Sequence, residues 1–134
     1  MAPIKKIEGI GEKYGTQLKM IGIGTVEALL ERGASVKGRQ EIAEKSSIGE
    51  HLILEWVNRA DLFRVKGVGE EYSDLLEASG VDTVVELAQR KAENLFEKMI
   101  AVNQEKKLVR KLPTLAQVSS WVEQSKKLPR IVTH

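Results

Sequence analysis

The stretch Ile7–Arg32, IEGIGEKYGTQLKMIGIGTVEALLER, recurs further along the chain as Val65–Arg90, VKGVGEEYSDLLEASGVDTVVELAQR. The two stretches align without a gap and at a constant offset, so that Gly9 aligns with Gly67 and Arg32 with Arg90. Ten of the 26 aligned positions carry the same residue, including both glycines of the Gly-apolar-Gly triplet near the start of each copy. Such identity without a gap indicates an internal duplication, so the chain is expected to contain one structural unit twice.

Each copy predicts a hairpin, a helix, a tight turn and a second helix. The glycines at the start permit positive φ angles and close approach of the backbone. In the first copy Tyr14 and Leu18 follow at a spacing of four, which places them on one helical face. Gly22 then ends the helix in a left-handed cap, and Thr25, or Asp82 in the second copy, can cap the next helix.

The opening of each copy resembles the helix-hairpin-helix motif, whose usual form is apolar-Pro-Gly-Ile-Gly followed four residues later by a small residue. Gly15 and Ser73 hold that small position. Glu8 and Lys66 stand where many members of the family have proline. The whole chain also resembles a group of small bacterial tandem helix-hairpin-helix proteins, from which no activity can be carried over.

We therefore predict an all-α protein in which two duplicated helix-hairpin-helix units pack as one compact helical domain with closing C-terminal helices. The single domain would span residues 1–134, which are enough to bury a sizeable core. Within it, residues 1–63 would hold the first repeat with its linking and leading helices, and residues 64–134 the second repeat with basic C-terminal helices. No stretch alternates between apolar and polar residues at period two, so no sheet is expected.

The remaining helices are predicted from capping signals and apolar faces. Ser47-Ile48-Gly49-Glu50 has the form of a capping box, so a helix from Ser47 to Phe63 is expected as the leading helix of the second copy. Other helices are expected at Ala34–Lys45 with Ser35 as its cap, at Ala92–Asn103, and after a second capping box at Thr114–Gln117.

The closing helices also look duplicated. Trp121-Val122 with Ser125 echoes Trp56-Val57 with Ala60, at an offset of 65 rather than 58. The second copy would therefore have gained seven residues. These tryptophans, with Tyr14 and Tyr72, lie on apolar helical faces, which favours core packing over stacking on bases.

Composition excludes several classes of site. The chain has no cysteine, so it has no disulfide and no zinc site built on thiolates. The start, MAPIKKIEGI, lacks the apolar run of a signal peptide, and no stretch approaches the length of a membrane helix, so a soluble cytoplasmic protein without membrane contact is expected. His51 and His134 lie far apart in sequence, and we expect no catalytic residues, no metal, no cofactor and no enzymatic activity.

The hairpins predict an anion site, because glycines before a helix N-terminus present free N–H groups and the positive end of the helix dipole. The resemblance implies that such hairpins bind the sugar-phosphate backbone without reading bases. The predicted phosphate-binding residues are Gly9, Ile10, Gly11, Lys13 and Lys6 in the first copy, and Gly67, Val68, Gly69, Arg64 and Lys66 in the second. Lys13 stands where the family often has a lysine at the helix start, whereas Glu71 replaces it in the second copy, which is the weaker candidate.

Charge is distributed unevenly along the chain. Residues 1–90 hold 12 Lys or Arg against 15 Asp or Glu, whereas residues 91–134 hold 9 against 4. The basic C-terminal region could add affinity for nucleic acid, form a solvated face, or dock on the acidic repeats of another copy or of a partner protein. Its cations are Lys106, Lys107, Arg110, Lys111, Lys126, Lys127 and Arg130.

These features predict weak binding to DNA or RNA backbone without sequence preference. The alternative is a protein-interaction or scaffolding module, in which the glycines only make tight turns that let helices pack. Fold does not decide between these functions.

Overall fold

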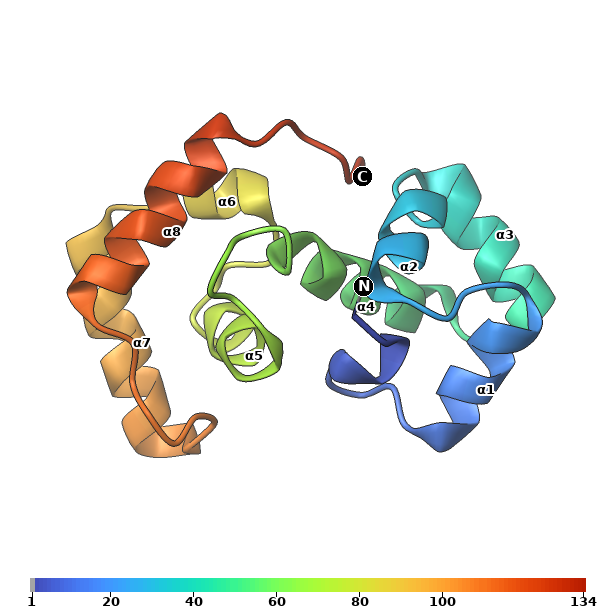
Figure 1. Ribbon diagram of the computed structural model, residues 1–134, viewed down its shortest axis with the longest axis horizontal. Coiled ribbons are helices and arrows are strands. Elements are labelled where there is room, and N and C mark those ends of the chain that lie inside the picture. The colour runs from blue at the N-terminus through green and yellow to red at the C-terminus, as the bar shows by residue number, and fades with distance from the viewer. Residues whose placement is uncertain (1) are drawn as a thin grey trace. The chain divides into compact units, whose positions relative to one another are not determined.

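The computed structural model of the protein describes residues 2–134. Within that range all elements of regular secondary structure are helices, and none is a strand (Figure 1). The predicted all-α class is thus confirmed. A single residue pair, Pro3 and Thr25, forms an isolated β-bridge. The elements are a 3-10 helix η1 (Ile4–Lys6) and the α-helices α1 (Glu12–Met20), α2 (Val26–Arg32), α3 (Val36–Ser46), α4 (Glu50–Leu62), α5 (Glu70–Ala78), α6 (Val84–Ala88), α7 (Ala92–Lys106) and α8 (Leu115–Lys127).

The described part of the chain forms two compact units of four α-helices each. Unit 1 comprises the residues up to Asp61 together with Ile131–His134, and unit 2 comprises Leu62–Arg130. The helices correspond pairwise: α1 and α5 are related by the offset of the aligned stretch, and α4 and α8 by the larger offset of their tryptophans. The duplication therefore extends from the aligned stretch to a complete four-helix unit.

The hairpin of each unit is a tight turn with the same hydrogen bond. Ile10 N–H donates to Ile7 O at 3.2 Å, and Val68 N–H donates to Val65 O at 3.1 Å. The third residue of each turn is a glycine with φ of 94°, a left-handed value that disfavours any side chain. The two turns are thus the same local structure at aligned positions of the repeat.

The turn between the two helices of each copy is repeated in the same way. Gly22 and Gly80 have φ of 87° and 93° and follow α1 and α5. Thr25 Oγ1 then accepts from Ala28 N–H at 3.1 Å and caps α2, as predicted. In the second copy the predicted cap Asp82 is wrong, because Thr83 caps α6.

A tryptophan closes each unit over its hairpin. Trp56 on α4 and Trp121 on α8 are each only 2% exposed. Trp56 packs on Tyr14 with ring centroids 5.1 Å apart, and Trp121 packs on Tyr72 at 5.2 Å. These pairs confirm that the closing helices are duplicated and that the tryptophans belong to the core.

Helix α4 corrects one sequence prediction. The capping signal predicts a helix that begins at Ser47 and leads into the second copy, but α4 begins at Glu50 and belongs to unit 1 as far as Asp61. Ser47 instead ends α3 with φ of 61°, a left-handed conformation that is incompatible with an N-cap. The second predicted capping box does form: Thr114 and Gln117 make both of its hydrogen bonds at the start of α8.

Unit 1 is completed by four residues from the far end of the chain. Val132 is buried, and Thr133 N–H donates to Ala34 O at 2.8 Å. The guanidinium of Arg39, a residue only 4% exposed, donates to Gly33 O at 2.9 Å and to Thr133 O at 2.6 Å. Burial lowers the pKa of Arg39, while the charge of Glu50 opposes that shift.

Unit 2 has a single apolar core. Helix α8 packs against α6 and α7, and α7 also packs against α5 (Figure 1). The fully buried side chains of this core come from the end of α4, from the hairpin, from the turn after α5 and from all four helices of the unit: Leu62, Val65, Leu75, Leu76, Val81, Val84, Leu87, Leu95, Met99, Val118 and Trp121.

We expect that replacing Trp56 or Trp121 with alanine will destabilise the protein by about 3–5 kcal/mol, since each change removes a fully buried aromatic side chain and leaves a cavity. Urea unfolding of the two variants, followed by circular dichroism, measures the loss. A tryptophan variant that unfolds at the same urea concentration as the parent would contradict the core assignment.

Candidate nucleic-acid interface

The glycines of both hairpins are exposed, whereas the apolar residues between them are buried. Ile10 and Val68 are 4% and 5% exposed and anchor the turns in the cores of their units. Their N–H groups donate within the turn, so neither amide is free to meet a ligand. Of the amides predicted to contact phosphate, those of Ile10 and Val68 are therefore already occupied inside the hairpin.

The helix starts provide the free donors. Gly11 and Gly69 are the N-cap residues of α1 and α5, and neither has a side chain that could cap the helix. The first N–H groups of an α-helix have no partner within the helix and carry the positive end of its dipole. Because Gly11, Glu12 and Lys13 are exposed, an anion can approach these groups directly.

The first hairpin combines this helix start with positive charge. Lys6 and Lys13 are exposed on either side of Gly9 and Gly11. Lys5 Nζ lies 2.7 Å from Glu12 Oε1, and this hydrogen bond and charge lower the pKa of the Glu12 carboxyl. The acidic side chain at the helix start is thus neutralised by a neighbour.

Lys5 is a site residue that the sequence prediction missed. Its aliphatic stem runs over Gly15, where an added Cβ would stand 3.4 Å from Lys5 Cε. The small residue at this position therefore leaves room for the lysine that pairs with Glu12. In the second copy Phe63 stands at the position of Lys5, and Ser73 Oγ donates instead to Glu70 O at 3.1 Å.

The second hairpin is held differently. The side-chain amide of Gln124 on α8 makes two hydrogen bonds to the backbone of Lys66. It accepts from the Lys66 N–H at 2.9 Å and donates to the Lys66 carbonyl at 3.2 Å. Arg64 Nη2 donates to Pro129 O at 2.6 Å. Both predicted cationic residues flank the turn. The hydrogen bonds of Lys66 use its backbone, whereas the guanidinium of Arg64 is itself committed to a contact within unit 2.

The start of α5 is acidic. Glu70 and Glu71 are exposed in its first turn, next to the free N–H groups of the helix. Their charges repel an anion at short range, and at the position of Glu71 the first hairpin carries Lys13. The two hairpins share a backbone conformation and differ in charge.

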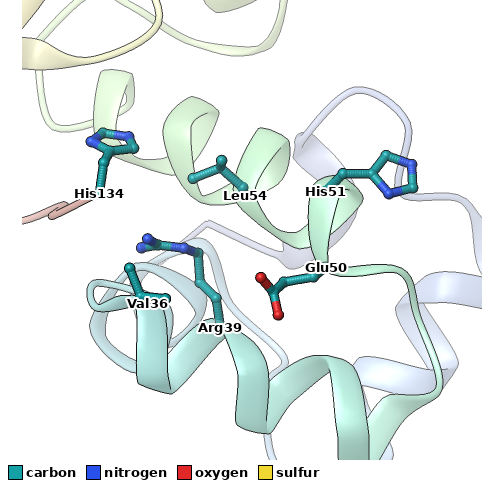
Figure 2. Close-up of a pocket in the computed structure, with 6 residues that line it drawn as sticks. All are labelled: Val36, Arg39, Glu50, His51, Leu54 and His134. Atoms are coloured by element: carbon teal, nitrogen blue, oxygen red, sulfur yellow. The ribbon is translucent and has the colours of Figure 1, made fainter.

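A separate cavity in unit 1 was not expected from the sequence. His51 and His134 both line it, although they are far apart in the chain. Figure 2 shows that the His51 ring points away from Arg39 and that the two imidazoles do not converge. The guanidinium of Arg39 is already used by backbone carbonyls, so this cavity lacks a convergent set of groups for catalysis.

Neither a metal site nor a membrane-spanning helix was found in residues 2–134. No group of three or more His, Asp or Glu side chains in this range is arranged to hold a metal ion. The same range contains no helix that is long and apolar enough to cross a membrane.

Comparison with known proteins gives one match. The model of a family described as "Domain of unknown function (DUF4332)" matches residues 8–128. No curated protein and no solved structure matches the chain.

We expect the two glycines of the first hairpin to differ in their tolerance of alanine. At Gly9 the positive φ is unfavourable for a side chain, and an added Cβ would stand 3.2 Å from Trp56 Nε1, so Gly9→Ala should cost at least about 1 kcal/mol. At Gly11 an added Cβ would meet nothing within 4 Å, so Gly11→Ala should cost less than about 1 kcal/mol, as expected for an N-cap change. Urea midpoints of the two variants provide the comparison, and equal midpoints would show that the turn does not require glycine at position 9.

Proposed function

Because the chain belongs to a family that is described only as a domain of unknown function (DUF4332), we propose a function from the geometry of the hairpins: weak, sequence-independent binding of DNA or RNA backbone. The observation that carries the proposal is the exposed start of α1, where the Gly11 cap leaves the helix N–H groups open beside Lys6 and Lys13. A phosphodiester group fits this combination of free donors, helix dipole and cations.

The repeated turn supports a tandem helix-hairpin-helix identity. Both copies have a glycine at φ of 94° and the same hydrogen bond across the turn, and both lead into a helix with a glycine N-cap. Only backbone groups would contact the ligand apart from a few cations, so the site has no means of distinguishing one base from another.

The alternative function, protein interaction, is supported by a different surface of unit 1. A depression of about 310 Å³ is lined mainly by apolar atoms of Leu30, Ala34 and Ile131, and Glu27 and Glu31 stand at the same depression. A basic, partly apolar segment of a partner protein would complement it. This surface does not involve the hairpin, so the two functions can be tested separately.

We expect Lys13→Glu to weaken nucleic-acid binding to all sequences alike and to reduce the slope of log affinity against log salt by about one, because one phosphate contact is lost. Parent affinity should be on the order of 10⁻⁴ to 10⁻⁶ M at physiological salt. Fluorescence anisotropy with labelled duplex and single-stranded DNA and RNA across a salt series measures both quantities. Lys37→Glu, an equal charge change at an exposed position of α3, is the control and should leave the slope unchanged.

We expect Glu71→Lys to strengthen binding several-fold and to increase the salt slope by about one, because a repelling carboxylate at the start of α5 becomes a cation. The side chain is exposed, so the substitution should change the free energy of unfolding by no more than about 0.5 kcal/mol. The same anisotropy series reports the result. If the parent does not bind nucleic acid at low salt and Glu71→Lys gains no binding, the hairpins serve only to pack the helices. The protein-interaction alternative is then favoured.

A further inference from the structure

The two units differ most in the connection before their closing helices. The first unit has a short connection, 47–49, between α3 and α4, whereas the second has a longer one, 107–114, between α7 and α8. Helix α7 is also longer, with 15 residues against 11 in α3. The insertion in the second copy therefore lies in the end of α7 and the loop that follows it, drawn in orange in Figure 1.

This loop is anchored to unit 2 through its backbone. The side-chain amide of Asn103 accepts from Val109 N–H at 2.9 Å and donates to Val109 O at 3.2 Å. Further along, Tyr72 Oη donates to Lys111 O at 3.0 Å, and Pro113 is buried. The capping box of α8 fixes the end of the loop. The loop thus has a defined conformation that does not depend on the side chains of Arg110 and Lys111.

The side chains that point outward from this segment are mostly cationic. Lys106, Lys107, Arg110 and Lys111 are all exposed. Lys107 has φ of 52°, a left-handed conformation that glycine and asparagine adopt more readily than lysine. We call these four residues the basic loop cluster.

The anchoring contact ties the loop, at Lys111, to the first turn of α5. Tyr72 is the third residue of α5, and its ring also packs on Trp121, whose Nε1 faces the turn at Gly67. The backbone of Lys111 is therefore tied to the same helix start at which Glu70 and Glu71 repel anions.

We propose that the basic loop cluster is a second nucleic-acid contact of the protein, which offsets the negative charge of Glu70 and Glu71 at the start of α5. This inference rests on the proposed function and extends it to a surface outside the hairpins. The ligand is the phosphodiester backbone of a strand that passes along unit 2, since cations held on a fixed loop fit a line of phosphates.

An anionic membrane surface is the competing partner. Leu112 and Leu115, at the end of the loop, are 36% and 38% exposed, so only part of each side chain could enter a bilayer. The strength of peripheral membrane binding grows with the apolar area that is buried as well as with the attraction of cations to anionic lipids. The four cations with so little exposed apolar surface favour nucleic acid.

The test is a double variant, Arg110→Glu with Lys111→Glu, in the full chain. Its matched control is Lys37→Glu with Lys45→Glu, which makes the same change in net charge at exposed positions of α3. Anisotropy with short labelled duplex and single-stranded DNA is measured from low to high salt, and cosedimentation is measured with vesicles of mixed neutral and anionic phospholipid. Circular dichroism and urea midpoints confirm that both variants fold.

We expect the loop variant to bind DNA at least about tenfold more weakly at low salt and to lose about two units of salt slope, as for the loss of two phosphate contacts, while the control keeps the parent slope. If the loop variant binds DNA like the control while Lys13→Glu weakens binding, the hairpin function stands and the loop inference is wrong. If the parent binds anionic vesicles but not DNA, and the loop variant loses the vesicles, the membrane is the partner and the inference is overturned together with the proposed function.

Discussion

The contact between a tryptophan ring and the hairpin turn sets the geometry of each unit. Nε1 of Trp56 lies so close to Gly9 that a Cβ there would stand 3.2 Å from it, and Trp121 meets Gly67 in the same way at 3.0 Å. The turn requires glycine for its φ angle, and the ring then covers the space that the missing side chain leaves. Since the tryptophan is carried by the closing helix, this contact ties the last helix of the unit to its first turn and fixes where the helix after the hairpin begins.

Much of the fold followed from local signals in the sequence. The gap-free repeat predicted the same order of helices in both copies, Thr25 and Ser35 cap their helices as expected, and Thr114 with Gln117 forms a capping box. These predictions succeeded because a turn, a cap and a helical face each depend on residues within a few positions of one another.

The failures concern choices that depend on tertiary context. Ser47 has the sequence of an N-cap, yet the chain needs a left-handed residue there to end α3, and it is Gly49 that directly precedes α4. The assignment of α4 to the second copy failed because apolar periodicity does not reveal which hairpin Trp56 covers. The pairing of Lys5 with Glu12 and the anchoring of the 107–114 loop by Tyr72 depend on contacts between distant positions, for which one sequence offers no periodic signal.

The duplicated site shows how one backbone can carry two different electrostatic environments. In unit 1 the acidic residue at the helix start is neutralised by Lys5, and the next residue is Lys13. In unit 2 two carboxylates occupy the helix start. The side-chain amide of Gln124 on α8 binds the backbone of the turn. The equivalent position of α4 carries the buried Arg59. Because the turn and the helix start are built from backbone conformation and apolar anchors, surface charge could diverge after duplication without disturbing either turn.

The return of the chain to unit 1 has a consequence for biosynthesis. The segment 62–130 is synthesised between the two segments that make up unit 1, so unit 1 cannot be completed until all of unit 2 has been made. Until Thr133 has been added, Arg39 Nη2 lacks the backbone carbonyl to which it donates. Leaving a buried charged donor without an acceptor destabilises the unit. Of the two units, the one whose synthesis begins earlier is therefore the one that is completed later.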